Sequence, residues 1–549
     1  MVKRKGYLMK GNLLLVSLLS LLMSSSLISN ETFSVNTINV AIPDLPLTLN
    51  PLMARDGISL RVIRLLFEPL YDYGPEMRYV PVLAYKEPLL LTNVLKVRIK
   101  EHLLWSDGTP LTAYDVEFTF KVLKTLNPPH LNESLSYLKS VKAVNEHEVE
   151  LEVDRRGISL ILEKILTLPI LQRNQWEPIF RKSLESRNPV EWFSKNWPQP
   201  LVSSGPFILE SWKGGVIILS KNRFYRLFEG PYIERAVLKV YKGTDDALLG
   251  LRRGEVDYIW WYLTPGYAEV LYGDPKINLV TSPGDYLYYV GFNLRRKPLN
   301  DIAFRKAVLE LVDKGFIVRN ILRDYGKEVC SLVPPWNVEW YSNCSIGEEV
   351  SLAMRVRKAR DILKEANYTW LGNSLIFKGE REPREIVIVV PSPDAEPILY
   401  KVGFALQHWL SKIGVRSKVK LLSLGKFIDT VFKRQEFDIF LYWVDTSFYP
   451  DYLRTMFYSK FSGKGMANVF GYKNVLFDSL VERLMGEENR DERKEIVLKM
   501  QKLLNKDVPC IPLCMPKLIE VHSGRFVGWV LMPGGIGNKW SFLSIRSSE

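Results

Sequence analysis

The sequence predicts an α/β protein with several structural layers, divided into two or three domains. Three observations lead to this class. Strand-like runs alternate with helical runs along the whole chain. The chain has 549 residues, more than a single hydrophobic core usually supports. Apolar residues make up 47% and charged residues 25%, the proportions of an ordinary globular protein.

The strand-like runs contain alternating or continuous apolar residues, many of them β-branched or aromatic. They occupy residues 38–42, 149–153, 215–220, 235–241, 286–294 and 385–390. In the helical runs, apolar residues recur every three or four positions. These runs occupy residues 58–70, 245–254, 302–312, 353–367, 400–414 and 491–506. We therefore expect helices packed on sheets throughout the chain.

One corner is specified in detail. Residues 95–100 alternate apolar and charged side chains, as a half-buried strand does, and WSDGTP (105–110) then supplies turn-forming residues. Thr112 is placed to cap the next helix, with Asp115 three residues later completing a variant capping box. The pattern predicts a strand, a tight turn and a capped helix, so we interpret this corner as structural.

The N-terminal 29 residues have the organisation of an export signal. Lys3, Arg4 and Lys5 precede a short apolar core at 13–23, and small residues follow it. Residues 1–29 are therefore expected to be a signal peptide, cleaved after Ser26, or an uncleaved N-terminal anchor. We expect the remainder to be a soluble ectodomain, either free or tethered at its N-terminus.

Export makes the four cysteines candidates for disulfide bonds. Cys330 and Cys344 bracket a short loop and are expected to form a bridge. Cys510 and Cys514 lie in a segment expected to be extended, where four residues span roughly 13 Å, too far for a mutual bridge. They are either buried thiols or partners of the other pair. The spacing does not suit zinc, and no metal site is predicted.

Motifs of common catalytic sites are missing from the sequence. There is no GxxxxGK[ST], HExxH or GxSxG pattern, and the five histidines are scattered. The acidic pairs at 245–246 and 348–349 have the look of solvated helix starts. We therefore predict no enzyme and no cofactor. The net charge is +13, but Lys and Arg form no dense block, so no nucleic-acid partner is expected.

The corner is also the start of a family resemblance. WSDGTPLTAYDVEFTFKVL (105–123) closely resembles a signature of the extracellular solute-binding proteins of ABC importers, in the dipeptide/oligopeptide-binding family (family 5). Further blocks resemble the same family in colinear order over about residues 38–540. They are residues 47–84, SSGPFILESW (203–212), LLGLRRGEVDYIW (248–260), residues 289–322 and residues 406–451.

This resemblance implies a two-lobed, periplasmic-binding-protein-like α/β fold, with an additional α+β domain in the first lobe. The first lobe would combine residues 35–75, 200–292 and 526–549. The additional domain would span 76–199, and the second lobe 293–525.

The resemblance also implies a function. The protein would be an extracellular or cell-surface substrate-binding subunit, expected to be a monomer. It would capture small peptides between two closing lobes and deliver them to ABC permease subunits in the membrane. Two alternatives stay open: the same role with an oligosaccharide ligand, and a secreted hydrolase or ligand-free surface protein on this scaffold.

The resemblance also indicates where a ligand would bind. In peptide-binding members, an Asp three residues after a Trp and four before a Pro holds the peptide's α-amine. Trp443 and Pro450 keep this spacing, but the position holds Thr446, and the carboxylate is one residue earlier, at Asp445. A shift of one residue in an extended segment turns a side chain to the other face. The amine anchor is therefore an open question, and its loss would favour a sugar.

Aromatic residues at 258–262 could contact such a sugar. Trp260 and Tyr262 are included among the predicted substrate-binding residues with Trp443, Asp445 and Thr446. Alternation along an extended segment would send Trp260 and Trp261 to opposite sides, so at most one of them is expected to contact ligand.

Overall fold

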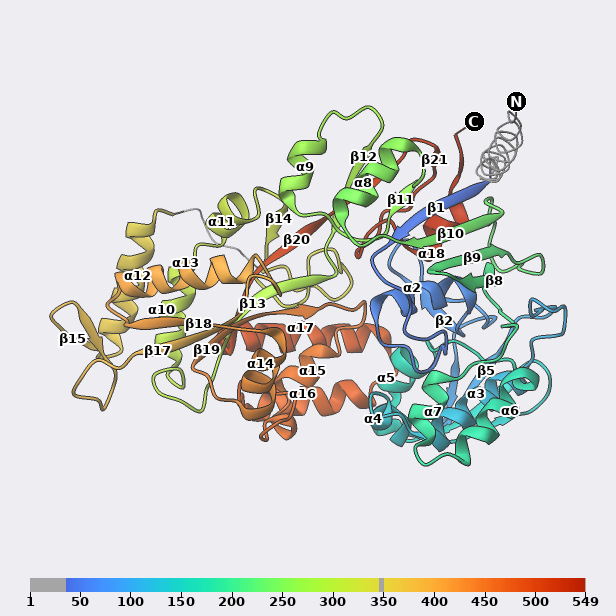
Figure 1. Cartoon of the computed structure of the whole chain (residues 1–549). Helices are drawn as coiled ribbons and strands as arrows, with labels where there is room; N and C mark the ends of the chain where they lie inside the picture. The colour runs from blue at the N-terminus through green and yellow to red at the C-terminus, as the bar shows by residue number, and fades with distance from the viewer. Residues whose placement is uncertain (1–35, 345–349, 549) are drawn as a thin grey trace, which may run out of the picture.

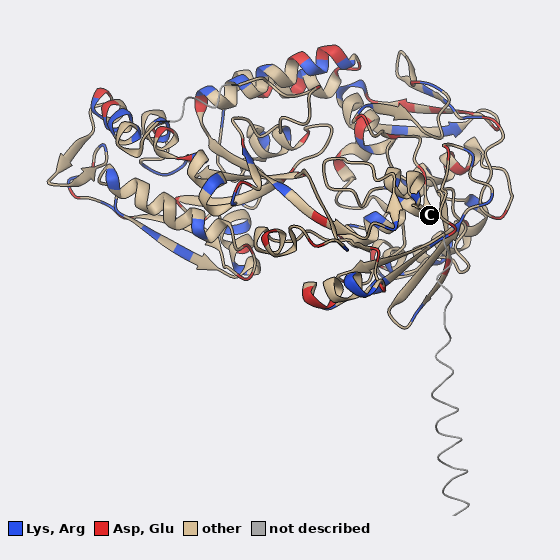
Figure 2. Ribbon diagram, turned by 90° about the horizontal axis from the view of Figure 1, so that it is seen from above, with Lys and Arg blue, Asp and Glu red and all other residues tan. Residues whose placement is uncertain are grey.

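The computed structural model describes residues 36–344 and 350–548 (Figure 1). The predicted signal peptide or anchor at 1–29 lies outside the described residues. Within the described part, no helix is both long and apolar enough to cross a membrane. Lys and Arg are interspersed with Asp and Glu over both halves of an elongated molecule (Figure 2).

A twelve-stranded mixed sheet runs through the described part of the chain (Figure 1). Its strands follow one another in the order β18 (Ser417–Leu422), β17 (Ile386–Pro391), β19 (Ile439–Asp445), β13 (Tyr286–Phe292), β20 (Cys510–His522), β11 (Tyr258–Ile259), β1 (Thr37–Ile42), β10 (Arg235–Val240), β9 (Val216–Lys221) and β8 (Phe207–Lys213). Two more strands, β12 (Asn278–Pro283) and β14 (Gly326–Glu328), also pair with β20. All six predicted strand-like runs are strands, five in this sheet and 149–153 in a smaller one.

Helices cover this sheet. In the first lobe they are α2 (Gly57–Leu66), α8 (Thr244–Arg253), α9 (Pro265–Leu271) and α18 (Lys539–Ser544). In the second lobe they are α10 (Ile302–Leu311), α11 (Lys314–Phe316), α12 (Leu352–Glu365), α13 (Leu399–Lys412), α14 (Leu424–Ile428), α15 (Tyr452–Phe457), α16 (Val475–Gly486) and α17 (Arg490–Asp507). Short strand pairs complete these parts: β2 (Tyr71–Tyr73) with β3 (Tyr79–Pro81), β15 (Thr369–Leu371) with β16 (Ser374–Ile376), and β21 (Phe526–Val527) with β22 (Arg546–Ser547).

The sequence of strand β13 is apolar almost throughout because both of its faces are buried. Tyr288 and Val290 pack into the core on one face of the sheet, while Leu287 and Tyr289 pack into the core on the other. Because both faces are covered, the strand reads as a continuous apolar run rather than an alternating one.

The chain passes between the lobes at two adjacent places. The first half of β20 pairs with β13 and β14, and its second half pairs with β11 and β12. At the other crossing, Gly284 donates its N–H to the carbonyl of Pro516 at 3.0 Å. A Cβ atom at Gly284 would lie 2.5 Å from that carbonyl oxygen, so the close approach requires glycine. The two crossings therefore lie near residues 284 and 516.

The additional domain is built on a four-stranded antiparallel sheet. Its strand order is β4 (Leu89–Leu91), β5 (Val94–Arg98), β7 (Glu148–Val153) and β6 (Leu138–Ala143). Its helices are α3 (Ala113–Leu126), α4 (Asn132–Ser136), α5 (Ile158–Leu160), α6 (Arg173–Leu184) and α7 (Pro189–Lys195). The capping box of Thr112 and Asp115 begins α3 as predicted. The indole of Trp105 donates to Asp115 at 3.3 Å, which holds the corner against the helix start.

Two further details concern the end of a helix and the cysteines. The helix expected over 58–70 ends at Leu66, because Phe67 is extended and Pro69 disfavours helical geometry just before it. Gly205 also donates its N–H to the carbonyl of Leu66 there. The structure joins Cys330 to Cys344, the predicted pair, with Cα atoms 6.0 Å apart. Cys510 and Cys514 are buried free thiols in β20.

Candidate functional site

Four side chains gather on one face of the paired strands β13 and β19, beside a lobe crossing. Tyr286 is paired with Asp445 and Tyr288 with Trp443, so all four point to the same face. The rings of Tyr286 and Tyr288 meet edge to face, with centroids 5.5 Å apart. Trp443 is partly exposed and is stacked on Tyr442 at 4.1 Å. Tyr288 is 2% exposed and belongs to the core, so the surface that remains consists of the rings of Tyr286 and Trp443 and the carboxylate of Asp445.

Asp445 is the last residue of β19 and is exposed to solvent. Although its side chain reaches solvent, the surrounding protein removes part of its hydration, which raises its pKa, and the nearby carboxylate of Asp285 raises it further. Among residues 36–344 and 350–548, no cation lies within ion-pair distance of Asp445, which leaves its charge uncompensated. A cationic group of a ligand would supply the missing partner.

Thr446 directly follows the last residue of β19 and is only 9% exposed. Its N–H and its hydroxyl both donate to the carbonyl of Asp285, at 2.6 and 2.7 Å. The structure therefore gives Thr446 a positioning role, since it ties the end of β19 to the lobe crossing. Of the two neighbouring positions, Asp445 is the one that shares a face with Trp443.

The first lobe contributes Arg61 from α2 and Tyr262, which follows β11. Arg61 donates to the carbonyl of Trp260 and to the hydroxyl of Tyr262, both at 2.8 Å. Tyr262 in turn donates to the carbonyl of Gly534 at 2.8 Å. Burial raises the pKa of Tyr262, so this hydroxyl stays protonated and can donate.

Arg61 also acts on the carboxylate at the crossing. Burial raises the pKa of Asp285, and the positive charge of Arg61 partly opposes this rise. Arg61 of the first lobe and the carboxylate of Asp285 at the crossing thus lie within electrostatic range of each other.

The structure does not bring Trp260 to this surface. Its side chain is 1% exposed, its ring packs on Phe542 at 5.3 Å, and its indole donates to the carbonyl of Gly537 at 2.8 Å. Trp260 therefore packs in the core of the first lobe. Trp261 is partly buried, and its indole donates to Thr244.

Aromatic residues from both lobes also meet beyond the crossing. Tyr73 of the first lobe stacks on Phe448 of the second at 4.5 Å, and Trp336 contacts Phe448 edge to face at 5.6 Å. The indole of Trp336 donates to the carbonyl of Gly284 at 3.0 Å. This contact connects the crossing to the surface where the lobes touch.

Several residues of the site were not identified from the sequence. Tyr286 and Tyr288 stood in a predicted strand, where the two-residue alternation of rings was a usable signal. Glu396, which accepts a hydrogen bond from Tyr288 at 3.1 Å, gave no signal, and neither did Arg61 or Asp285. In the described part of the chain, no group of His, Cys, Asp or Glu is arranged to hold a metal ion.

Residues 78–465 match the family model described as "Bacterial extracellular solute-binding proteins, family 5 Middle". Over 514 aligned residues the chain is 25% identical to the oligopeptide-binding protein OppA of Bacillus subtilis. The aligned region covers 91% of this chain and 90% of OppA.

Solved structures show the same two-lobed fold. The oligopeptide-binding protein AppA of Bacillus subtilis, in complex with a nonapeptide, has a TM-score of 0.68 and 20% identity, covering 93% of this chain and 99% of AppA. The periplasmic oligopeptide-binding protein of Thermotoga maritima, bound to mannohexaose, has a TM-score of 0.69 and 22% identity. The match covers 94% of this chain and 100% of the Thermotoga maritima chain.

Proposed function

The chain belongs to the bacterial extracellular solute-binding proteins of family 5, and on this basis we propose that it is the substrate-binding subunit of an ABC importer. It captures peptides between its two lobes and delivers them to permease subunits in the membrane. Its relative OppA is an oligopeptide-binding protein, and the structurally similar AppA was solved with a nonapeptide.

The observation that carries the peptide assignment is the position of Asp445. Its carboxylate lies on the same face as Trp443, and Tyr286 is its partner on the neighbouring strand. Among the described residues it has no cationic partner. A peptide's α-ammonium is a compact cation that needs such a partner when a site closes over it. We therefore propose that Asp445 anchors the amine in place of Thr446, whose hydroxyl already donates to Asp285.

An oligosaccharide is the second candidate ligand. It is favoured by the partly exposed ring of Trp443 next to Tyr286, because sugars stack on aromatic faces. The Thermotoga maritima relative was solved with mannohexaose, so this fold accommodates a sugar in that protein. The uncompensated carboxylate of Asp445 favours the peptide.

The proposal includes the protein's setting. The family consists of solute-binding proteins, so we propose binding and release of an unchanged ligand rather than catalysis. We further propose export through residues 1–29, as a cleaved signal or as an anchor, and action as a monomer outside the membrane.

The test is isothermal titration with a short peptide and with its N-acetylated form. We expect the free-amine peptide to bind more tightly, and Asp445→Asn to weaken its binding by roughly 2 kcal/mol or more. The matched control is Asp394→Asn, since Asp394 is an exposed carboxylate of the same lobe. Equal affinity of wild-type protein for both peptide forms would contradict the amine anchor and favour the oligosaccharide.

A further inference from the structure

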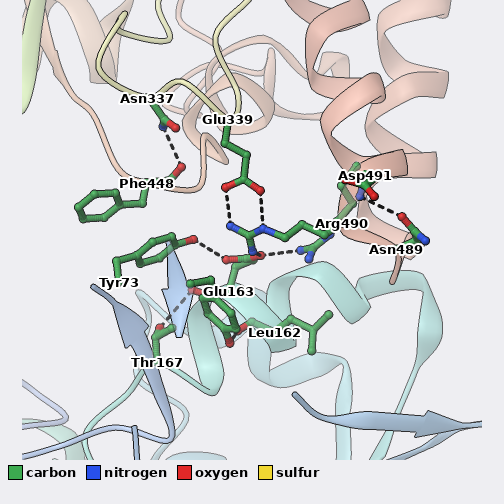
Figure 3. Close-up of polar contacts among 12 residues, drawn as sticks. Tyr73, Leu162, Glu163, Thr167, Asn337, Glu339, Phe448, Asn489, Arg490 and Asp491 are labelled. Carbon is green, nitrogen blue, oxygen red and sulfur yellow. Dashed lines mark hydrogen bonds and ion pairs between the residues drawn. The ribbon is translucent and has the colours of Figure 1, made fainter. Parts of the chain in front are cut away.

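Two groups of charged and polar side chains, partly buried, join the first lobe and its additional domain to the second lobe. Figure 3 shows the group around Glu163. The Glu163 cluster consists of Tyr73, Glu163, Glu339, Arg490 and Arg493. The Asp451 cluster consists of Glu133, Lys164, Asp451 and Arg454. The helices α5 and α16, which contact each other, lie below the strands that cross between the lobes in Figure 1.

Glu163 is the centre of the first cluster. It forms ion pairs with Arg493 at 2.7 Å and with Arg490 at 3.2 Å, and it accepts a hydrogen bond from Tyr73 at 2.7 Å. The side chains of Glu163 and Arg493 are 1% and 4% exposed, so their charges are removed from water. Arg490 also binds both carboxylate oxygens of Glu339, at 2.5 and 2.8 Å.

The position of the two arginines is unusual for a helix. Arg490 and Arg493 lie in the first turn of α17, where the helix dipole disfavours positive charge. Their spacing of three residues puts them on one face, toward Glu163. The two arginines do not stabilise the helix at this end, but they give the carboxylate of Glu163 in the other lobe two cationic partners.

Asp451 is the centre of the second cluster. Lys164 contacts its carboxylate at 2.5 Å, and Arg454 binds it through two hydrogen bonds of 2.6 and 3.0 Å. Arg454 is 1% exposed and also binds Glu133 of the additional domain at 2.6 and 2.9 Å. Burial acts to raise the pKa of Asp451, but the charges of Lys164 and Arg454 outweigh it and lower that pKa to about 2.

Opening of the lobes about the crossings near 284 and 516 would separate the partners in both clusters and expose them to water. When buried ions separate, they lose their mutual attraction but regain hydration, and the two free energies largely cancel. An ionic interface can therefore open and close reversibly. Removing one partner while the interface stays closed is different, because it leaves a buried charge without compensation.

We infer that the Glu163 and Asp451 clusters form an interlobe latch, which holds the lobes together even without ligand. This latch goes beyond ligand capture and does not depend on which ligand binds. It would lower the free energy of the closed form in every ligation state, and thereby raise apparent affinity by increasing the binding-competent fraction.

The test is small-angle X-ray scattering of the ligand-free protein, comparing wild type, Glu163→Gln and the control Glu191→Gln. Glu191 forms an exposed ion pair with Lys195 in α7 and takes no part in either cluster. We expect wild type and the control to match the scattering calculated from this structure. Glu163→Gln should have a larger radius of gyration, with the open-to-closed ratio raised roughly tenfold or more.

Either of two results would overturn the latch. One is a ligand-free wild type that already scatters as an open form, and the other is a Glu163→Gln protein as compact as the control. If Glu163→Gln does not fold, Glu133→Gln decides instead, because Glu133 has a 42% exposed side chain at the rim of the Asp451 cluster. Since no ligand is added, failure of the peptide assignment would not affect the outcome.

Discussion

Two tryptophans of this chain show how position alone separates a ligand contact from a core residue. Trp443 is partly exposed on the face that carries Asp445, whereas Trp260 is 1% exposed and hydrogen-bonded to Gly537. Both rings are large enough to bind a sugar or a peptide side chain. Only Trp443 has surface left to do so.

We therefore expect opposite effects from truncating the two tryptophans. Trp443→Ala should weaken ligand binding with little loss of folding stability. Trp260→Ala should lower the free energy of unfolding by about 3–5 kcal/mol, because it leaves a cavity in the first lobe. Urea unfolding and isothermal titration of both variants give the comparison. A stable Trp260→Ala protein that has lost binding would instead return Trp260 to the ligand site.

At the scale of elements, the backbone is most tightly constrained where the two segments that cross between the lobes lie side by side. Gly284 lies between β12 and β13, and an added Cβ would be 2.5 Å from the carbonyl oxygen of Pro516 on β20. A contact this short with backbone cannot be relieved by a side-chain rotation, so the two crossing segments would have to move apart.

Gly284→Ala should accordingly destabilise the protein by about 1–3 kcal/mol and change the balance between open and closed forms. Gly425→Ala is the matched control, because Gly425 lies in α14 with no atom within 4 Å of its added Cβ. That change should be neutral or stabilising by up to about 1 kcal/mol. Thermal unfolding and scattering of both variants test this, and equal behaviour would show that the crossing tolerates displacement.

Features that depend on neighbouring residues could be predicted from the sequence, whereas contacts between distant segments could not. The capping box at Thr112 and Asp115 depends on residues close together in the chain, and so do the predicted strands and helices, so the sequence pattern of each could be recognised. The contacts of Glu163 with Arg490 and Arg493 join positions more than 300 residues apart, and no local sequence pattern predicts them. Asp285 and Arg61 likewise acquire their surroundings only through the packing of the lobes.

At the scale of the whole molecule, ligand binding and protonation are linked at the junction of the lobes. Burial raises the pKa of Asp445, Asp285 and Glu396 above the ordinary carboxylate value of about 4. The ligand-free folded protein therefore holds more protons on these groups than the unfolded chain does. Their contribution to folding stability consequently rises as the pH falls through the raised pKa values.

Binding of a peptide should follow the opposite trend. An ammonium group placed against Asp445 favours the ionised carboxylate, so binding should release protons, and affinity should fall as the pH drops through the raised pKa of Asp445. Titrations of the free-amine peptide from neutral to mildly acidic pH, in buffers of different ionisation enthalpy, measure both effects. Asp445→Asn should flatten the pH dependence, whereas the exposed control Asp394→Asn should retain it. An affinity that does not change over this range would mean that no carboxylate at the lobe junction accepts the ligand's charge.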